Sequence, residues 1–146
     1  MAFREFKNLT IVRKNGPIPV VPFLRMKEVI LGKQYTLTII FARPEEVRVR
    51  NKEYRGKDYT TNVLSFPLSK TEGEIYISLS KVRSGAKDFD MSYQEFLHFL
   101  LIHGMLHLKG YDHSSTMEKL EGNYLKKFFR GTHYKRNDRG TRHRER

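Results

Sequence analysis

The sequence contains no cysteine and no tryptophan, and acidic residues are scarce relative to basic ones. Without cysteine the chain forms no disulfide and offers no thiolate to a metal ion. The apolar run nearest in length to a membrane span, FLHFLLIHGMLHL, is short and contains three histidines. The N-terminal residues MAFREFKNLT lack the apolar core of a secretion signal. We therefore expect a cytoplasmic protein with no membrane partner and no disulfide partner.

The shortage of acidic residues leaves a strongly basic chain. The 28 Lys and Arg residues outnumber the 16 Asp and Glu residues, which gives a formal charge of +12 and a pI near 10.0. Such an excess favours a polyanionic partner, with nucleic acid ahead of a membrane surface. A cationic surface that serves only solubility would give the same count.

The length and composition fit one folded domain with a basic tail. A chain of 146 residues with 38% apolar residues can bury a core without disulfides or structural metals. We assign residues 1–130 to a single domain. Residues 131–146 carry six basic and two acidic side chains and no apolar pattern, so we expect this tail to be disordered.

The apolar spacing predicts an α+β fold with a small mixed sheet packed with helices. Strands are expected at 9–13, 35–41, 62–66 and 74–79, and helices at 20–31, 44–54, 80–88, from 92 to about 109, and 115–129. Pro67 should end the third strand. Capping-box patterns, Ser-x-x-Glu, mark the starts of the last two helices at Ser92 and Ser115. The helix from Ser92 is apolar on most sides, so we expect it to be the central buried helix.

This central helix carries a metal-ligand pattern, HGMLHLKGYDH at 103–113. His103 and His107 are four residues apart and therefore share one helix face. Gly110 can end the helix in a left-handed conformation and turn His113 back toward that face. Three neutral imidazoles with an open fourth position are typical of a catalytic zinc site, and nickel, copper or iron remain possible. The alternative, a core or capping role for all three histidines, requires a coincidence of spacing.

Such a site predicts hydrolytic chemistry. Three neutral ligands leave the full charge on the ion, which polarises a phosphoryl or carbonyl oxygen and lowers the pKa of a bound water to about 7. The spacing also matches the frame of the metzincin proteases, whose general base is a glutamate directly after the first histidine. This chain has Gly104 there. A water-activating group must come from elsewhere, or a metal hydroxide acts without one.

Two further polar residues lie near the motif. Asp112 could orient an imidazole or act as an acid/base near the ion, and the alternative is a cap for the following helix. His98 lies around the helix from the metal face. It is expected either to form a buried hydrogen bond or to face the substrate groove.

The motif, together with YRGKDYTTNVLSF at 54–66 and GEIYIS at 73–78, closely resembles the YbeY family of bacterial metal-dependent endoribonucleases. The resemblance runs from about residue 9 to 129. It implies a zincin-like fold, one Zn²⁺ ion held by His103, His107 and His113, and cleavage of single-stranded RNA. It further implies a role at the small ribosomal subunit, in 3′-end processing of rRNA and in ribosome quality control.

The resemblance also implies roles for residues outside the histidine motif. Arg55 matches the arginine of the family's YRGKD block and is expected in the substrate cleft, where a guanidinium can clamp a phosphate and stabilise its charge. Asn62 and Ser65 lie on a strand that could line this cleft. Asn62 and Glu74 stand where family members often have aspartate, and Asn62 cannot act as a carboxylate base.

Two other functions remain open from the sequence. One is a metalloprotease or other amide hydrolase, suggested by the metzincin frame but opposed by Gly104 and by the charge. The other is a non-enzymatic ribosome-binding factor in which zinc is only structural.

Overall fold

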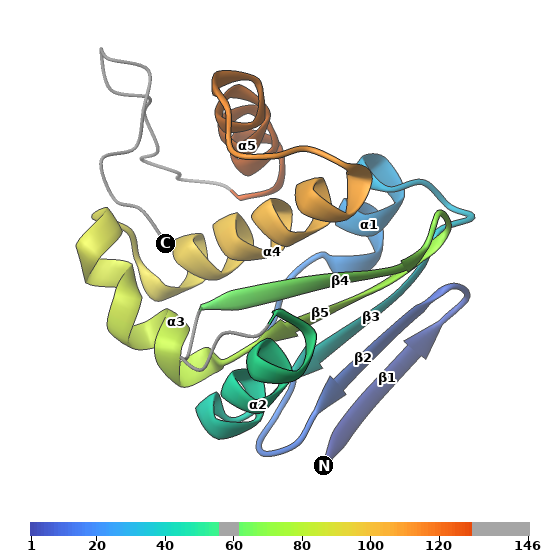
Figure 1. Ribbon diagram of the computed structural model, residues 1–146. Coiled ribbons are helices and arrows are strands. Elements are labelled where there is room, and N and C mark those ends of the chain that lie inside the picture. Colours follow the sequence, from blue (N-terminus) through green and yellow to red (C-terminus); the bar gives the residue numbers. More distant parts are fainter. Residues whose placement is uncertain (56–61, 130–146) are drawn as a thin grey trace.

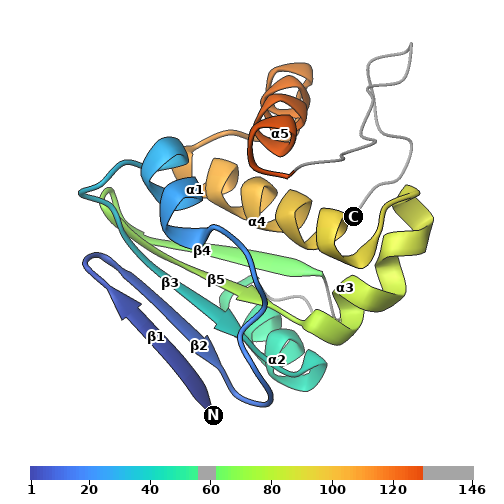
Figure 2. The same cartoon turned by 180° about the vertical axis from the view of Figure 1, so that it is seen from behind.

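The computed structural model describes residues 1–55 and 62–129, with only the backbone of Arg55 included. A five-stranded sheet is covered by helices on both faces (Figures 1 and 2). The strands are β1 (Ala2–Phe6), β2 (Leu9–Arg13), β3 (Thr36–Phe41), β4 (Val63–Ser69) and β5 (Glu72–Ile77). The helices are α1 (Phe23–Ile30), α2 (Pro44–Arg55), α3 (Leu79–Gly85), the 3₁₀ turn η1 (Ala86–Phe89), α4 (Tyr93–Lys109) and α5 (Ser115–Phe128).

The sheet is mixed, with the strand order β1-β2-β3-β5-β4. The central strands β2, β3 and β5 are parallel, and the edge strands β1 and β4 each run antiparallel to their neighbour. This arrangement confirms the predicted α+β class with a small mixed sheet. Within the described ranges, no helix is long and apolar enough to cross a bilayer.

Alternation along the central strands separates two apolar cores. In β3, Leu37, Ile39 and Phe41 face the larger core, which also contains buried residues of α1, α3 and α4. Ile40 points to the opposite face and joins Val47 of α2 in a second, smaller core. Because strand side chains alternate between faces, the Thr-Leu-Thr-Ile-Ile-Phe sequence of β3 can supply both layers.

Helix α4 is the buried centre of the larger layer, as predicted. Eleven of its 17 residues are buried, and it lies between the sheet and α5 (Figure 1). Ser92 caps its N-terminus by accepting a hydrogen bond from the backbone N–H of Glu95. Each fully buried Leu or Phe contributes about 1.5–3 kcal/mol relative to exposure, so burial rather than helix propensity holds α4 in place.

Several predicted boundaries were wrong for identifiable reasons. The first helix begins at Phe23 rather than at residue 20, because the residue before Pro22 is disfavoured in the helical region. Strand β4 continues through Pro67, because an edge strand has a side that needs no N–H donor. The last helix is capped by Ser114, not by Ser115. Strand β1 was not predicted at all.

Gly104 allows α4 to approach the sheet closely. A Cβ atom at this position would lie 3.0 Å from Ser65 Oγ and 3.1 Å from Ile75 Cδ1. In addition, the Ser65 hydroxyl donates a hydrogen bond of 3.0 Å to the carbonyl oxygen of Gly104. Side chains of β4 and β5 therefore occupy the space beside Gly104, the residue that follows His103.

Gly104→Ala should lower the free energy of unfolding by about 1–3 kcal/mol, because overpacking outweighs the better helix propensity of alanine. Urea denaturation monitored by circular dichroism measures this difference. Lys119→Ala, at an exposed position of α5, is the matched control and should change stability little. Equal stability of Gly104→Ala and the wild type would contradict the packing argument.

Candidate metal centre

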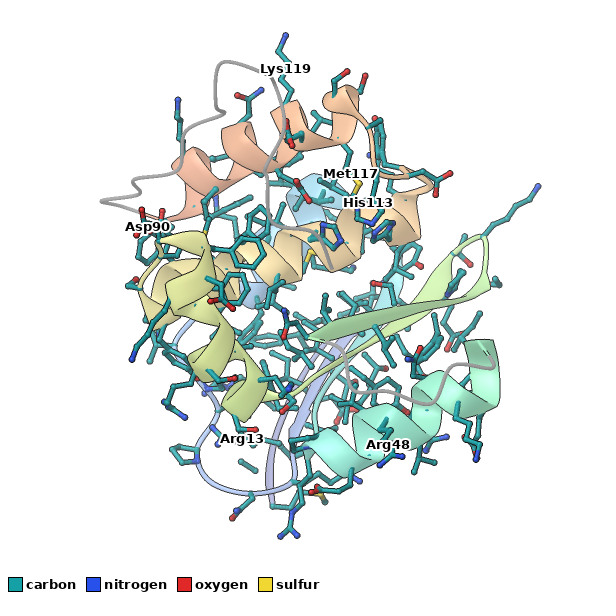
Figure 3. All side chains as sticks on the ribbon, turned by 60° about the vertical axis from the view of Figure 1, so that its left-hand side comes forward. Arg13, Arg48, Asp90, His113, Met117 and Lys119 are labelled. Carbon is teal, nitrogen blue, oxygen red and sulfur yellow. The ribbon has the colours of Figure 1, made fainter. Side chains whose placement is uncertain are left out.

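The three histidines of the motif converge in space. One ring nitrogen from each of His103, His107 and His113 lies within 4.8 Å of the others. The ring centroids are 4.5 Å apart for His103 and His107, and about as close for each of them to His113, at 5.1 and 5.0 Å. His113 is exposed at the junction between α4 and α5, so the cluster faces solvent on that side (Figure 3).

The C-terminus of α4 positions the third histidine. Gly110 has a φ of 111°, and its N–H donates to the carbonyl of His107, while the N–H of Tyr111 donates to that of Leu106. This is a Schellman motif, which requires a left-handed residue that glycine adopts without strain. The turn reverses the chain and brings His113 beside the two helical imidazoles, as the sequence predicted.

Hydrogen bonds on the outer nitrogens orient the two helical imidazoles. His107 Nδ1 lies 2.9 Å from the carbonyl oxygen of Tyr111, which can only accept, so Nδ1 carries the proton. His103 Nδ1 donates to the carboxylate of Glu121 in a short contact. The lone pair of each ring therefore resides on Nε2, and the two Nε2 atoms are 3.1 Å apart.

Burial keeps His107 neutral. Removal from solvent, with a further contribution from His103, lowers the pKa of His107 to about 4, although the hydrogen bond to Tyr111 opposes this shift. His107 is thus a neutral imidazole at pH 7, which is the form that binds metal ions. The side chain of His103 is 12% exposed and its partner Glu121 is 6% exposed, so their hydrogen bond is shielded from water.

The donor set fits a metal ion. The Nε2 lone pairs of His103 and His107, 3.1 Å apart, do not attract each other, whereas a cation between them would be stabilised by both. Tetrahedral coordination with zinc–nitrogen bonds of 2.0–2.1 Å requires nitrogen atoms about 3.3 Å apart, close to the observed separation. Fixing the proton on Nδ1 by an outer partner is also how metal-binding histidines are usually held.

Comparison with known proteins agrees with this geometry. The sequence model of the family Endoribonuclease YbeY matches residues 20–128. The chain belongs to the YbeY family. An Endoribonuclease YbeY from Malacoplasma penetrans is 37% identical over 123 residues, which cover 80% of this chain and 78% of that protein.

Other members of the YbeY family match over shorter lengths. An Endoribonuclease YbeY from Alkaliphilus oremlandii is 40% identical over 89 residues, 54% of this chain and 59% of the relative. The chain spans about three fifths of the length of the Alkaliphilus relatives that it matches.

The solution structure of a Thermotoga maritima protein superposes with a TM-score of 0.56, at 28% identity, over 81% of this chain and 87% of that one.

Glu121 is the site residue that the sequence analysis missed. It lies on α5, four residues after buried Met117 and four before buried Leu125. A carboxylate in the middle of a buried helix stripe needs a partner, because burying a charge alone is costly. The position of Glu121 in this apolar stripe was the signal available in the sequence. Its partner in this YbeY family member is His103.

The structure places the other predicted site residues as follows. Ser65 is buried and bonded to Gly104, and Asn62 is half-buried near Gly85. Asp112 is exposed in the turn after α4 and does not cap α5, since Ser114 does. Arg55 ends α2, and its side chain lies outside the described residues. The substrate or catalytic roles of these residues stay predictions.

His98 is 4% exposed, with Nδ1 2.7 Å from the carbonyl oxygen of Gln94 and its ring 4.8 Å from that of Phe129. This is the buried, hydrogen-bonded environment that the sequence analysis gave as one of two alternatives. Burial lowers the pKa of His98 below its ordinary value of 6.5, although the hydrogen bond to Gln94 opposes the shift. A role for His98 in substrate binding stays a prediction.

The lowered pKa of His98 predicts a loss of stability in mild acid. Below about pH 6.5 the unfolded chain binds a proton at His98 that the native protein does not, so the free energy of unfolding falls as the pH decreases. His98→Phe keeps a ring and removes the titration. Urea denaturation between pH 7 and 5 should show a shallower pH dependence for the variant; an unchanged dependence would contradict this account.

Glu121→Gln should weaken metal binding about 10–100-fold, because an uncharged partner holds the Nδ1 proton of His103 less strongly. Competition with a chromophoric chelator measures the affinity directly, without reference to activity. Glu45→Gln, at an exposed position in the first turn of α2, removes the same charge and should leave the affinity unchanged. Equal affinities for both variants would show that Glu121 does not support the site.

Proposed function

We propose that this chain is a metal-dependent endoribonuclease. The observation that carries the proposal is the cluster of three converging imidazoles, with two held by outer hydrogen bonds, in a member of the YbeY family. The relatives that match are themselves named Endoribonuclease YbeY. The formal charge of +12 supports a polyanionic substrate.

We propose one zinc ion as the cofactor, held by His103, His107 and His113. Three imidazoles without thiolates suit zinc among the common metals. When bound, the ion supplies Lewis acidity toward a phosphoryl oxygen at the cleavage site. The remaining contributions come from the protein.

The protein's part is to hold protons and charges in place. The carboxylate of Glu121 and the carbonyl of Tyr111 keep the protons of His103 and His107 on Nδ1, so both Nε2 lone pairs face the cluster. Arg55 is proposed to bind a phosphate oxygen and stabilise its developing charge. Asp112, exposed beside His113, is available for proton transfer.

The proposed substrate is single-stranded rRNA of the small ribosomal subunit, cut during 3′-end processing and quality control in the cytoplasm. Asn62, Ser65 and His98 are proposed to contribute to the substrate cleft. The rRNA assignment rests on the sequence resemblance and on the basic charge. Asn62 and Ser65 are included because of their strand, and His98 because of its position on the helix that carries the motif. We propose that residues 1–130 form the catalytic domain.

Gly104 weighs against the amide-hydrolase alternative. A metzincin-type glutamate at this position would place its Cβ at 3.0 Å from Ser65 Oγ and 3.1 Å from Ile75. The side chains of Ser65 and Ile75 would therefore have to shift to admit a glutamate at this position. The helix face that a protease uses for its base is here used for packing.

The deciding experiment is to incubate metal-loaded protein with fragments of rRNA and map the product ends. Internal cuts confined to single-stranded segments are expected, and the end chemistry distinguishes attack by water from attack by a ribose 2′-hydroxyl. His107→Ala should lose both metal and cleavage. Arg55→Ala should retain the metal and cut about 100-fold more slowly, because one charge-stabilising donor is lost.

Lys7→Gln, in the exposed turn between β1 and β2, is the control for a general loss of basic charge and should cut normally. Absence of RNA products from the metal-loaded protein would overturn the proposal. If removing the metal also unfolded that inactive protein, a structural-zinc ribosome factor would be the better description. Turnover of casein that is abolished in His107→Ala would instead favour the amide hydrolase.

A further inference from the structure

A pocket with several basic and hydroxyl side chains in its lining lies at the carboxyl ends of the parallel strands. Its walls come from the segments that follow β2, β3 and β5, and it includes Arg13, Lys14, Arg43, Ser78 and Ser80. None of the metal ligands lines it. Figure 3 shows Arg13 well separated from His113, so the pocket is distinct from the metal centre.

The connections between strands explain why a pocket forms here. After β2 the chain passes to α1, whose buried residues belong to the larger core. After β3 it passes to α2, whose Val47 belongs to the smaller core on the other face. Neighbouring parallel strands whose connections leave toward opposite faces create a crevice outside their carboxyl ends, where open sheets bind ligands.

The charge of this pocket points to an anion. Its lining contains three cationic side chains, Arg13, Lys14 and Arg43, and no acidic residue. The three cations come from two different connections, so the fold rather than one run of sequence brings them together. Guanidinium groups match the oxygens of a phosphate, and an ammonium adds a mobile point charge.

The contacts of the three cations leave them suited to this role. Arg13 donates one hydrogen bond of 2.6 Å to the carbonyl oxygen of Pro17, which holds its side chain in place while a guanidinium has four further N–H donors. Lys14 pairs with Glu46 at 3.4 Å, and both side chains are substantially exposed, so this ion pair is weak enough to yield to a stronger anion. Arg43 is exposed at the start of α2.

The other side of the pocket supplies hydroxyl groups. Ser78 is fully buried and accepts the N–H of Lys81 at the start of α3, and its oxygen lies 3.1 Å from that of Ser80. Ser80 is exposed at the rim. A tetrahedral oxyanion entering the pocket would therefore meet cations on one side and a hydroxyl donor on the other.

We propose that this pocket binds a phosphate group. This proposal rests on the proposed function: the phosphate belongs to the backbone of an RNA strand that extends beyond the cleavage site. A free nucleotide offers the same chemistry, and the experiment below separates the two sources. The pocket would then anchor RNA at a second point on the protein.

The first measurement is a titration of the full chain with inorganic phosphate, followed by amide chemical shifts in NMR. Saturable shifts are expected for residues 13–15, 43, 45–46 and 78–80, since Pro44 has no amide N–H. The double variant Lys14→Gln/Arg43→Gln should lose them, and Lys7→Gln, which removes a basic charge at the other end of β2, should keep them. No saturable shift in the wild type, or the same shifts in the double variant, would overturn the proposal.

The second measurement identifies the source of the phosphate. A single-stranded RNA oligonucleotide should displace phosphate from the pocket, and the double variant should bind that RNA more weakly. In a plot of log affinity against log salt concentration, the slope for the double variant should be less steep than that for the wild type by about 0.7. This is the value for one lost phosphate contact to a single strand. If uridine monophosphate displaces phosphate and RNA does not, the pocket is a nucleotide site. Both readouts are independent of cleavage, so a failure of the proposed nuclease activity would not affect them.

Discussion

The close contact between helix α4 and the sheet at Gly104 is the constraint on which the rest of the structure depends. It places the buried helix against β4 and β5, where a further methyl group would lie only 3.0 Å from Ser65 Oγ and 3.1 Å from Ile75 Cδ1. The hydroxyl of Ser65 bonds to the helix carbonyl at the same point, so the two layers are fixed in register as well as in distance. This contact sets how closely the helix that carries His103 and His107 packs on the sheet.

The same burial prepares the imidazoles for binding a metal. Helix α4 is buried on most sides, and this burial removes His107 from water and keeps it neutral. Their protons are then fixed by two acceptors from different parts of the chain, the turn carbonyl of Tyr111 and the carboxylate of Glu121 on α5. One partner therefore comes from the turn that ends α4, and the other comes from the helix α5 that packs against it.

The fold separates two kinds of polar site. The metal centre is built on a helix that covers one face of the sheet, whereas the basic pocket is built from loops at the carboxyl ends of the parallel strands. The first site gathers three imidazoles and the second gathers three cationic side chains. Under the proposals above, an RNA strand would be cut at the first site and held at the second.

The α+β class, most of the elements, the capped central helix and the clustering of His103, His107 and His113 could be predicted from the sequence, because they depend on local spacing of residues along the chain. It did not reveal β1, whose short, largely exposed strand has little apolar pattern, or the passage of β4 through Pro67, which depends on being at an edge. The sequence did not show that Glu121 bonds to His103, that Gly104 packs against Ser65, or that Arg13 and Arg43 line one pocket. The members of these pairs are 18 to 39 positions apart, and the chain brings them together only when its layers pack.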